Sequence, residues 1–228
     1  MTTSSENALS RAPASTWPAS LGAVVLVGLV AFTLGVLTAY AQGWLPEQVG
    51  SLANSSGSWA LAAFLLAMLP RKPALAALAG TVCLIALLVG YIVGADVRGF
   101  PSSGSLIVFW GTAAVVAGPL LGLGGWWVKN RPGPLAALGV GAISGVLVGE
   151  GVYGLTFVAD TTSPPYWWGS IAAGLALLVA VGAASRLPRR GDLGLALGIC
   201  AVAAAAFVGL YSQGSSLMMV LSFAGSVA

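Results

Sequence analysis

The sequence contains very few charged residues, no histidine and only two cysteines. Charged side chains make up 7% of its 228 residues, whereas a soluble domain carries about 25%. So few charges cannot cover the surface of a water-facing globule, and the mean hydropathy of +0.96 indicates a protein whose solvent is lipid. The basic residues stand singly or in small groups at the ends of apolar runs, so we expect no nucleic-acid partner.

The lack of histidine narrows the chemistry further. Cys83 and Cys200 lie far apart inside apolar runs, so neither a zinc site nor a Cys–His nucleophile is expected. We interpret both as buried thiols that behave as small apolar side chains. The P-loop and the motifs H-E-x-x-H and G-x-S-x-G are also missing. The sequence therefore predicts no metal, no cofactor and no enzymatic activity.

One short stretch, GEGVYG at 149–154, has the spacing G-x-G-x-x-G of a dinucleotide-binding loop. That fingerprint requires a preceding strand, a solvated helix start and an acidic residue about 20 positions later. Here the stretch lies inside an apolar run, and the residue 20 positions after Gly149 is Gly169. We therefore exclude a dinucleotide site and interpret the glycines as a thin helix face.

Long apolar runs predict an all-α polytopic transmembrane bundle of about seven helices. Residues 1–18 form a polar, cytoplasmic tail, 19–211 a single transmembrane domain, and 212–228 an apolar tail that lies on the membrane or extends the last helix. The second run is short, so it either recruits residues 51–56 to cross or lies partly at the interface, which would leave six spans. The expected helices cover about 20–41, 52–69, 73–94, 105–128, 135–158, 167–185 and 193–211.

The basic residues predict the orientation of this bundle. With a cytoplasmic N-terminus, every lysine and arginine except Arg98 falls on the inner side. This distribution follows the positive-inside rule, so we expect the N-terminus inside.

Two similar turns indicate an internal repeat. LPRK at 69–72 and LPRR at 187–190 each join two apolar runs, and Gly80 and Gly198 follow them at the same offset. This pattern predicts two three-helix units, 19–94 and 133–211, joined by the helix at 105–128 as a 3+1+3 parallel repeat. The alternative is chance similarity between helices rich in glycine.

Glu150 is a carboxylate inside an apolar run. A charge at the membrane centre costs about 2.5–3.5 kcal/mol on insertion scales, so Glu150 should face a cavity, find a partner or be protonated. Arg98, in the outer loop, is the cation that we expect to pair with it. The alternative is one structural hydrogen bond between helices.

Other polar and aromatic residues fall at a similar depth and predict an outward-facing cavity. Gln42, Asn54 and Tyr153 would supply polar contacts, and Trp59 and Trp110 would supply stacking surfaces. For Trp59 the competing interpretation is a place in the interfacial aromatic belt.

Small residues repeat every four positions in three of the expected helices. Such stripes allow close helix packing in lipid, either inside the chain or against a partner. They comprise Ala31, Gly35 and Ala39, then Gly118 and Gly122, then Gly141, Gly145 and Gly149.

Several short motifs resemble an uncharacterised bacterial integral-membrane family, a domain of unknown function. They are QGWLP (42–46), GSLANSSGSW (50–59), RGFP (98–101), AGPLLGL (117–123) and GEGVYG (149–154). The resemblance covers about residues 20–185 and implies a bacterial plasma-membrane location, multi-pass, without a known activity. The size and the small-residue face of the first helix also resemble the substrate-binding subunits of energy-coupling-factor transporters, which usually have six helices.

These observations predict a small-molecule permease, or the binding subunit of one, with an outward-facing polar cavity. Its expected partners are the lipid bilayer and a small polar or amphipathic ligand. The alternative is a non-catalytic structural or accessory subunit of a larger membrane complex, whose glycine faces dock other subunits.

Overall fold

The computed structural model describes residues 16–213, and over this range all regular structure is helical. Six of the helices are long and apolar enough to cross a membrane, and α2 is shorter. This confirms the predicted all-α membrane bundle. In chain order the elements are α1 (Thr16–Trp44), the 3-10 helix η1 (Glu47–Asn54), α2 (Ser56–Leu66), α3 (Pro73–Val97), α4 (Gly104–Asn130), α5 (Pro134–Phe157), α6 (Pro164–Ala183) and α7 (Arg190–Ser212).

Local signals set the starts of several long helices. Pro73, Pro134 and Pro164 stand in the first turns of α3, α5 and α6, where the missing N–H has no intrahelical partner to lose. Ser103 caps α4 by accepting a hydrogen bond from the backbone N–H of Leu106 at 3.4 Å. The six long helices begin and end within a few residues of the predicted ranges. Of the predicted tails, 1–18 and 212–228, residues 1–15 and 214–228 lie outside the described residues.

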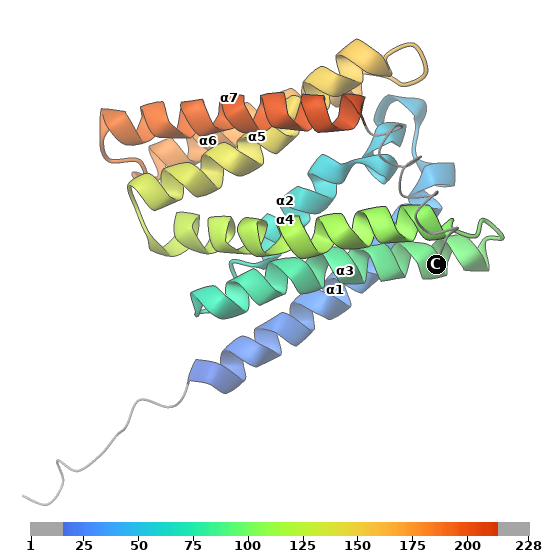
Figure 1. Ribbon diagram of the computed structural model, residues 1–228, viewed down its shortest axis with the longest axis horizontal. Coiled ribbons are helices and arrows are strands. Elements are labelled where there is room, and N and C mark those ends of the chain that lie inside the picture. Colours follow the sequence, from blue (N-terminus) through green and yellow to red (C-terminus); the bar gives the residue numbers. More distant parts are fainter. Residues whose placement is uncertain (1–15, 214–228) are drawn as a thin grey trace, which may run out of the picture.

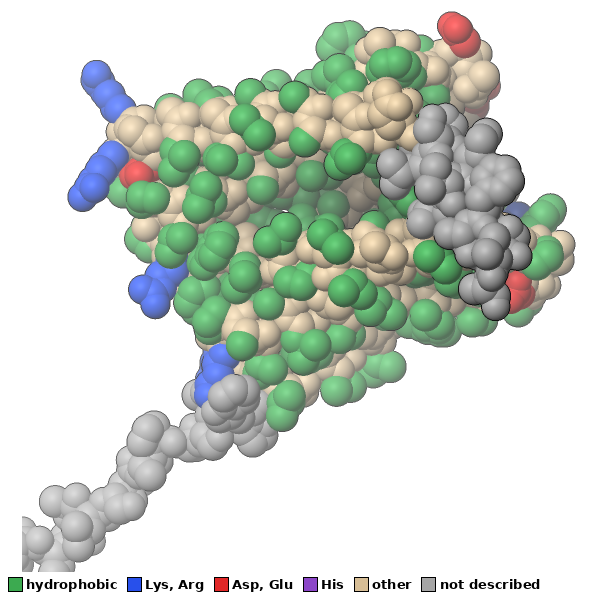
Figure 2. Space-filling view, in the orientation of Figure 1, with side chains coloured by type: hydrophobic (Ala, Val, Ile, Leu, Met, Phe, Trp, Pro, Cys, Tyr) green, Lys and Arg blue, Asp and Glu red, His purple; other side chains and the backbone are tan. Residues whose placement is uncertain are grey.

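The described basic residues gather at one end of the bundle, with Arg98 as the exception (Figure 2). We call this the basic end and the opposite one the far end. Short loops meet at the basic end: the backbone N–H of Arg71 donates to Ser20 Oγ at 3.3 Å, and Trp126 Nε1 donates to the carbonyl of Arg71 at 3.1 Å. Arg186 Nε donates to the carbonyl of Val128 at 2.8 Å. The basic residues thus share one end, as the positive-inside prediction requires, and the assignment of that end to the cytoplasm stays a prediction.

The long helices form two groups of three (Figure 1). In one, α3 lies between α1 and α4; in the other, α5 packs against both α6 and α7. The short α2 lies between the groups and contacts α3, α4 and α5. The grouping therefore differs from the predicted repeat in its first unit, because α4 packs along α3 in place of α2, which also contacts α4 and α5. The second predicted unit, 133–211, coincides with the second group.

Glycines and alanines allow close contacts within each group. A Cβ at Gly118 would lie 2.5 Å from the Cα of Thr81 on α3, and a Cβ at Gly145 would lie 2.5 Å from the carbonyl of Cys200 on α7. A Cβ at Gly35 would overlap the carbonyl of Leu87 on α3. Gly122 is likewise against α3, Gly141 and Gly149 face α7, and Ala31 and Ala39 are fully buried.

The two groups meet closely near the basic end. A Cβ at Gly139 of α5 would lie 2.9 Å from the carbonyl carbon of Gly124 on α4. Beside this contact Phe64 of α2, only 2% exposed, packs its ring against Gly124. The basic end is thus closed by apolar packing. Farther along the bundle the surface is hollowed between α4 and α7 (Figure 2).

Candidate functional site

The second apolar segment is interrupted in its middle. The 3-10 helix η1 ends at Asn54, Ser55 is extended, and α2 begins at Ser56. Its 11 residues span about 16 Å at 1.5 Å per residue, roughly half of a hydrocarbon core of about 30 Å. The N-terminus of α2 therefore opens inside the bundle, and the single helix predicted over 52–69 is replaced by two shorter elements.

Glu150 of α5 meets this helix start with both carboxyl oxygens. Its Oε1 accepts from the backbone N–H of Gly57 at 2.9 Å and from Ser56 Oγ at 3.3 Å. Its Oε2 accepts from Ser55 Oγ at 2.9 Å. The side chain is 4% exposed. Glu150 thus satisfies free donors of the first turn of α2 and lies at the positive end of the helix dipole.

Gly57 is required for this approach. A Cβ at position 57 would overlap Oε2 of Glu150 and lie 3.0 Å from its carboxyl carbon. The hydroxyl of Ser55 accepts from the backbone N–H of Ser58 at 2.8 Å while it donates to Glu150. The sequence Ser55-Ser56-Gly57 therefore both starts the helix and leaves room for a carboxyl group from another helix.

A third element contributes Ser170, on α6. Its Oγ lies 2.8 Å from the carbonyl oxygen of Leu147 and 3.4 Å from Glu150 Oε2. The phenol groups of Tyr166 and Tyr211 lie beside Ser55 and Ser56, respectively. Glu150 is therefore surrounded by hydroxyl groups from α2, α6 and α7.

The predicted pair between Arg98 and Glu150 is wrong. Within residues 16–213 neither residue forms an ion pair; Arg98 Nη1 instead donates to the carbonyl of Ala39. Its guanidinium carbon lies 5.6 Å and 5.4 Å from the ring centroids of Tyr40 and Phe100. The physical reason is that each charge has a nearer partner. Arg98 lies at the far end beside carbonyls at the end of α1, and Glu150 reaches the donors of α2.

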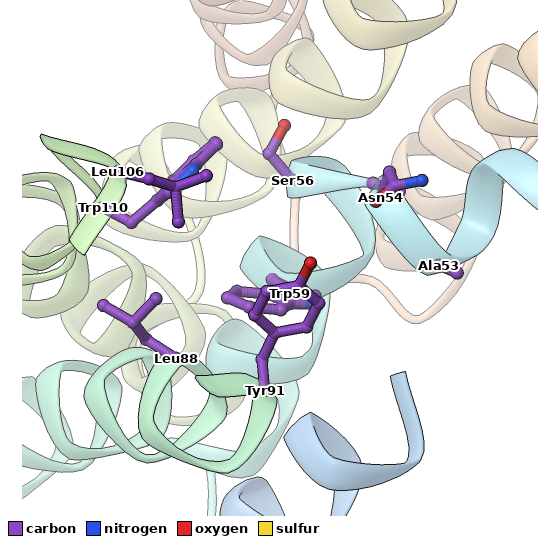
Figure 3. Close-up of a pocket in the computed structure, with 9 residues that line it drawn as sticks. Ala53, Asn54, Ser56, Trp59, Leu88, Tyr91, Leu106 and Trp110 are labelled. Carbon is purple, nitrogen blue, oxygen red and sulfur yellow. The ribbon is translucent and has the colours of Figure 1, made fainter. Parts of the chain in front are cut away.

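A pocket of about 120 Å³ lies next to the carboxyl group (Figure 3). Leu106 and Trp110 of α4 face Trp59 and Tyr91 across it, and the rings of Trp59 and Tyr91 are edge to face at 6.1 Å. Ser55 and Ser56 belong both to this wall and to the hydrogen bonds of Glu150. The lining comprises Ala53, Asn54, Ser55, Ser56, Trp59, Leu88, Tyr91, Leu106 and Trp110.

Gln42 supports the pocket from behind its wall. Its Nε2 donates to Asn54 Oδ1 at 2.6 Å and to the hydroxyl of Tyr91 at 3.2 Å. These bonds join α1, η1 and α3. Gln42 does not line the pocket itself, and it orients two residues that do.

Tyr153 lies elsewhere, between α5 and α7. Its ring stacks on Phe157 at 5.2 Å and meets Tyr211 edge to face at 5.5 Å. Tyr211 in turn lies 6.5 Å from Trp110, so Tyr153 reaches the pocket only through another ring. Of the seven residues predicted for the site, Asn54, Trp59 and Trp110 line the pocket, Glu150 and Gln42 stand behind its wall, and Arg98 and Tyr153 are outside it.

Residues of this site that the sequence did not predict include Gly57, Ser170 and Tyr91. The sequence around Gly57 could have indicated its role, since a glycine after two serines next to an apolar segment is typical of a helix interruption. The sequence around Ser170 and Tyr91 gives no such indication, because a single polar residue on an apolar helix does not reveal which neighbouring helix it faces. Within residues 16–213, no three histidine, cysteine, aspartate or glutamate side chains gather in a group that could hold a metal ion.

The chain belongs to a family of unknown function, DUF6518, whose model matches residues 13–216. The match agrees with the predicted resemblance to an uncharacterised family and extends beyond it. Neither the curated proteins nor the solved structures contain a match to this chain. The likeness to energy-coupling-factor subunits therefore stays a prediction.

Proposed function

We propose that this protein is a small-molecule permease, or the substrate-binding subunit of one, which takes a polar or amphipathic ligand into the pocket beside α2. The observation that carries the proposal is the interrupted second segment. It sets the polar residues Asn54 to Ser56 opposite the rings of Trp59, Tyr91 and Trp110 in the interior of a membrane bundle. Transporters commonly build substrate sites at such interrupted helices.

The available hydrogen-bonding groups favour a ligand that presents acceptors. Among residues 16–213 the indole N–H groups of Trp59 and Trp110 and the amide N–H groups of Asn54 have no acceptor. The hydroxyls of Ser55 and Ser56 already donate to Glu150. The wall contains no charged side chain, so an uncharged ligand is favoured.

The volume of the pocket limits the size of the ligand. Its volume of about 120 Å³ is somewhat smaller than a cavity of about 150 Å³ that holds benzene. One small ring therefore nearly fills the pocket, and because the pocket is partly open, a carbonyl or hydroxyl group on that ring would lie in its opening. Because Gly124, Gly139 and Phe64 close the basic end, entry from the far side or from the bilayer is favoured.

The alternative of an accessory subunit has less support. It rested on glycine faces that would dock other subunits. Gly118 and Gly122 lie against α3, and Gly145 and Gly149 lie against α7, so these faces are covered by helices of the same chain.

Three probes of similar size and different charge test the proposal: benzamide, benzoate and benzylammonium. Binding is measured by thermal shift and tryptophan fluorescence in lipid nanodiscs. We expect benzamide to bind with millimolar affinity, typical of a small fragment, and at least about tenfold tighter than either ion.

Two tryptophan variants localise that binding. Trp59→Leu should abolish benzamide binding, whereas Trp168→Leu, which removes an indole that is 61% exposed, should leave it unchanged. If no probe binds, or if both variants behave alike, the pocket is not a ligand site.

A further inference from the structure

The hydroxyl of Ser170 has one hydrogen and two acceptors close to it. Its Oγ lies 2.8 Å from the carbonyl oxygen of Leu147 and 3.4 Å from Glu150 Oε2. The shorter contact takes the hydrogen, because hydrogen-bond strength falls steeply with distance. The remaining contact then joins two oxygen lone pairs, unless the carboxyl group itself carries a hydrogen and donates it to Ser170.

The surroundings of the same carboxyl group also stabilise its ionised form. Without a proton it accepts from Gly57 N at 2.9 Å, from Ser55 Oγ at 2.9 Å and from Ser56 Oγ at 3.3 Å. These donors and the N-terminus of α2 stabilise a negative charge without a cation. Glu150 therefore has partners in both protonation states.

We propose that Glu150 is a reversible proton-binding site, with Ser170 Oγ as the acceptor of the bound proton and Ser56 as its connection to the pocket. The site lies inside the membrane bundle, where ionisable residues often mark proton pathways. The proton-binding step stands on this geometry alone. Its coupling to a ligand rests on the proposed function.

Ser56 alone can carry a proton between the pocket and Glu150. It is partly exposed, lines the pocket and donates to Glu150 Oε1. When Ser56 passes its hydrogen to Oε1 it takes one from a hydronium ion in the pocket, which becomes water, so one proton enters and the serine is unchanged. After the carboxyl group rotates, its proton faces Ser170. Release reverses these steps.

Protonation would alter the pocket wall. It removes the negative charge facing the first turn of α2 and one acceptor lone pair, which weakens the bonds from Gly57 and Ser56. The other titratable groups facing this site are the phenols of Tyr166 on α6, Tyr211 on α7 and Tyr153 on α5. Phenols are neutral at physiological pH, so the carboxyl group is the one that changes charge.

Infrared spectroscopy tests proton binding directly and without a ligand. The chain has three glutamates, Glu6, Glu47 and Glu150, so a Glu6→Gln/Glu47→Gln protein labelled with ¹³C-glutamate reports Glu150 alone. In nanodiscs, from about pH 4 to about pH 9, which spans exposed and buried glutamates, we expect the C=O band of the protonated carboxyl group to disappear reversibly as pH rises.

Ser170→Ala tests where the bound proton is held. If Ser170 accepts from the protonated group, its removal should lower the midpoint of the band's titration by about one pH unit, the scale of one hydrogen bond. Ser212→Ala, which removes an exposed hydroxyl bonded to its own helix, is the control and should not move it. A band that does not titrate, or a midpoint that rises in Ser170→Ala, overturns the proposal.

Benzamide affinity measured over the same pH range separates the two proposals. A change of at least about threefold between the ends of the titration is expected from the loosened first turn of α2. Benzamide binding without a titrating band would leave the pocket in place and refute the proton site. A titrating band without binding of any probe would support proton binding and refute the permease.

Discussion

Two neighbouring residues of α5 face two different kinds of environment. Gly149 lies in a dry seam, where an added Cβ would stand 2.8 Å from the carbonyl of Ala204 on α7. Glu150 faces the start of α2, where hydroxyl and N–H groups surround its carboxyl group. The seam holds one three-helix group together by close backbone approach, and the polar contact lies between groups. Function is therefore expected around the start of α2, where polar atoms and open space coincide.

The contact between the groups is itself uneven along its length. Near the basic end it consists of Gly124, Gly139 and the ring of Phe64. Toward the far end α4 borders the pocket between Trp59 and Trp110, whose wall comes from η1, α2, α3 and α4. Lipid offers no hydrophobic drive for helices to associate, so the helices are held together by close packing of small residues. Where that packing is missing, the helices leave room for a ligand.

The seam should be the more sensitive region. Gly145→Leu would force a side chain against the carbonyl of Cys200 and the Cβ of Ala203, at 2.5 Å each, so we expect loss of folded protein or destabilisation above about 3 kcal/mol. Thermal unfolding in detergent measures it. Gly198→Leu on α7, where nothing lies within 4 Å, is the matched control. Equal behaviour of the two variants would show that the seam does not stabilise the fold.

Gly57→Ala should have the next largest effect. The added methyl group overlaps the carboxyl group of Glu150, which must move away from its donors at a cost of about 2 kcal/mol. Gly50→Ala in η1 meets nothing within 4 Å and should cost less than about 1 kcal/mol. Chemical unfolding in mild detergent compares the two. A Gly57→Ala protein as stable as Gly50→Ala would mean that the close approach is not needed.

Glu150→Gln should cost less, about 1–2 kcal/mol. The amide keeps one oxygen for Gly57 and Ser56 and turns its NH₂ group toward Ser170, so that only Ser55 loses its acceptor. Glu47→Gln, a change at an exposed site, should lie within about 0.5 kcal/mol of the parent. Both are followed by thermal unfolding. A stable Glu150→Gln protein would show that the Ser55 bond contributes little.

Tyr153→Phe should have the smallest effect, within about 0.5 kcal/mol. The ring contacts with Phe157 and Tyr211 persist, and among residues 16–213 the hydroxyl has no hydrogen-bond partner. Benzamide binding should also be unchanged, because Tyr153 does not line the pocket. Weaker probe binding in this variant would place Tyr153 in the site after all.

Hydropathy and local helix signals were enough to predict the long helices, since length, apolar composition and flanking prolines act within one segment. The small-residue stripes also followed from the sequence, but their partners did not. Gly118 repeats like Gly145, and nothing in that spacing states that one faces α3 and the other α7. The Arg98–Glu150 pair failed for a related reason: opposite charges suggest a contact, whereas backbone donors and carbonyls, which every residue carries, were nearer partners.

Composition alone determined that this chain is a membrane helix bundle, because so apolar a chain with so few charges requires lipid as its solvent. The basic residues likewise determined which helix ends lie together. Only the tertiary structure decided what Glu150 does. Its donor Gly57 is 93 residues away in the chain, and the N–H of Gly57 is free only because α2 begins there. A helix start inside the bundle, a glycine beside it and a carboxyl group from α5 have to meet in space before a site exists.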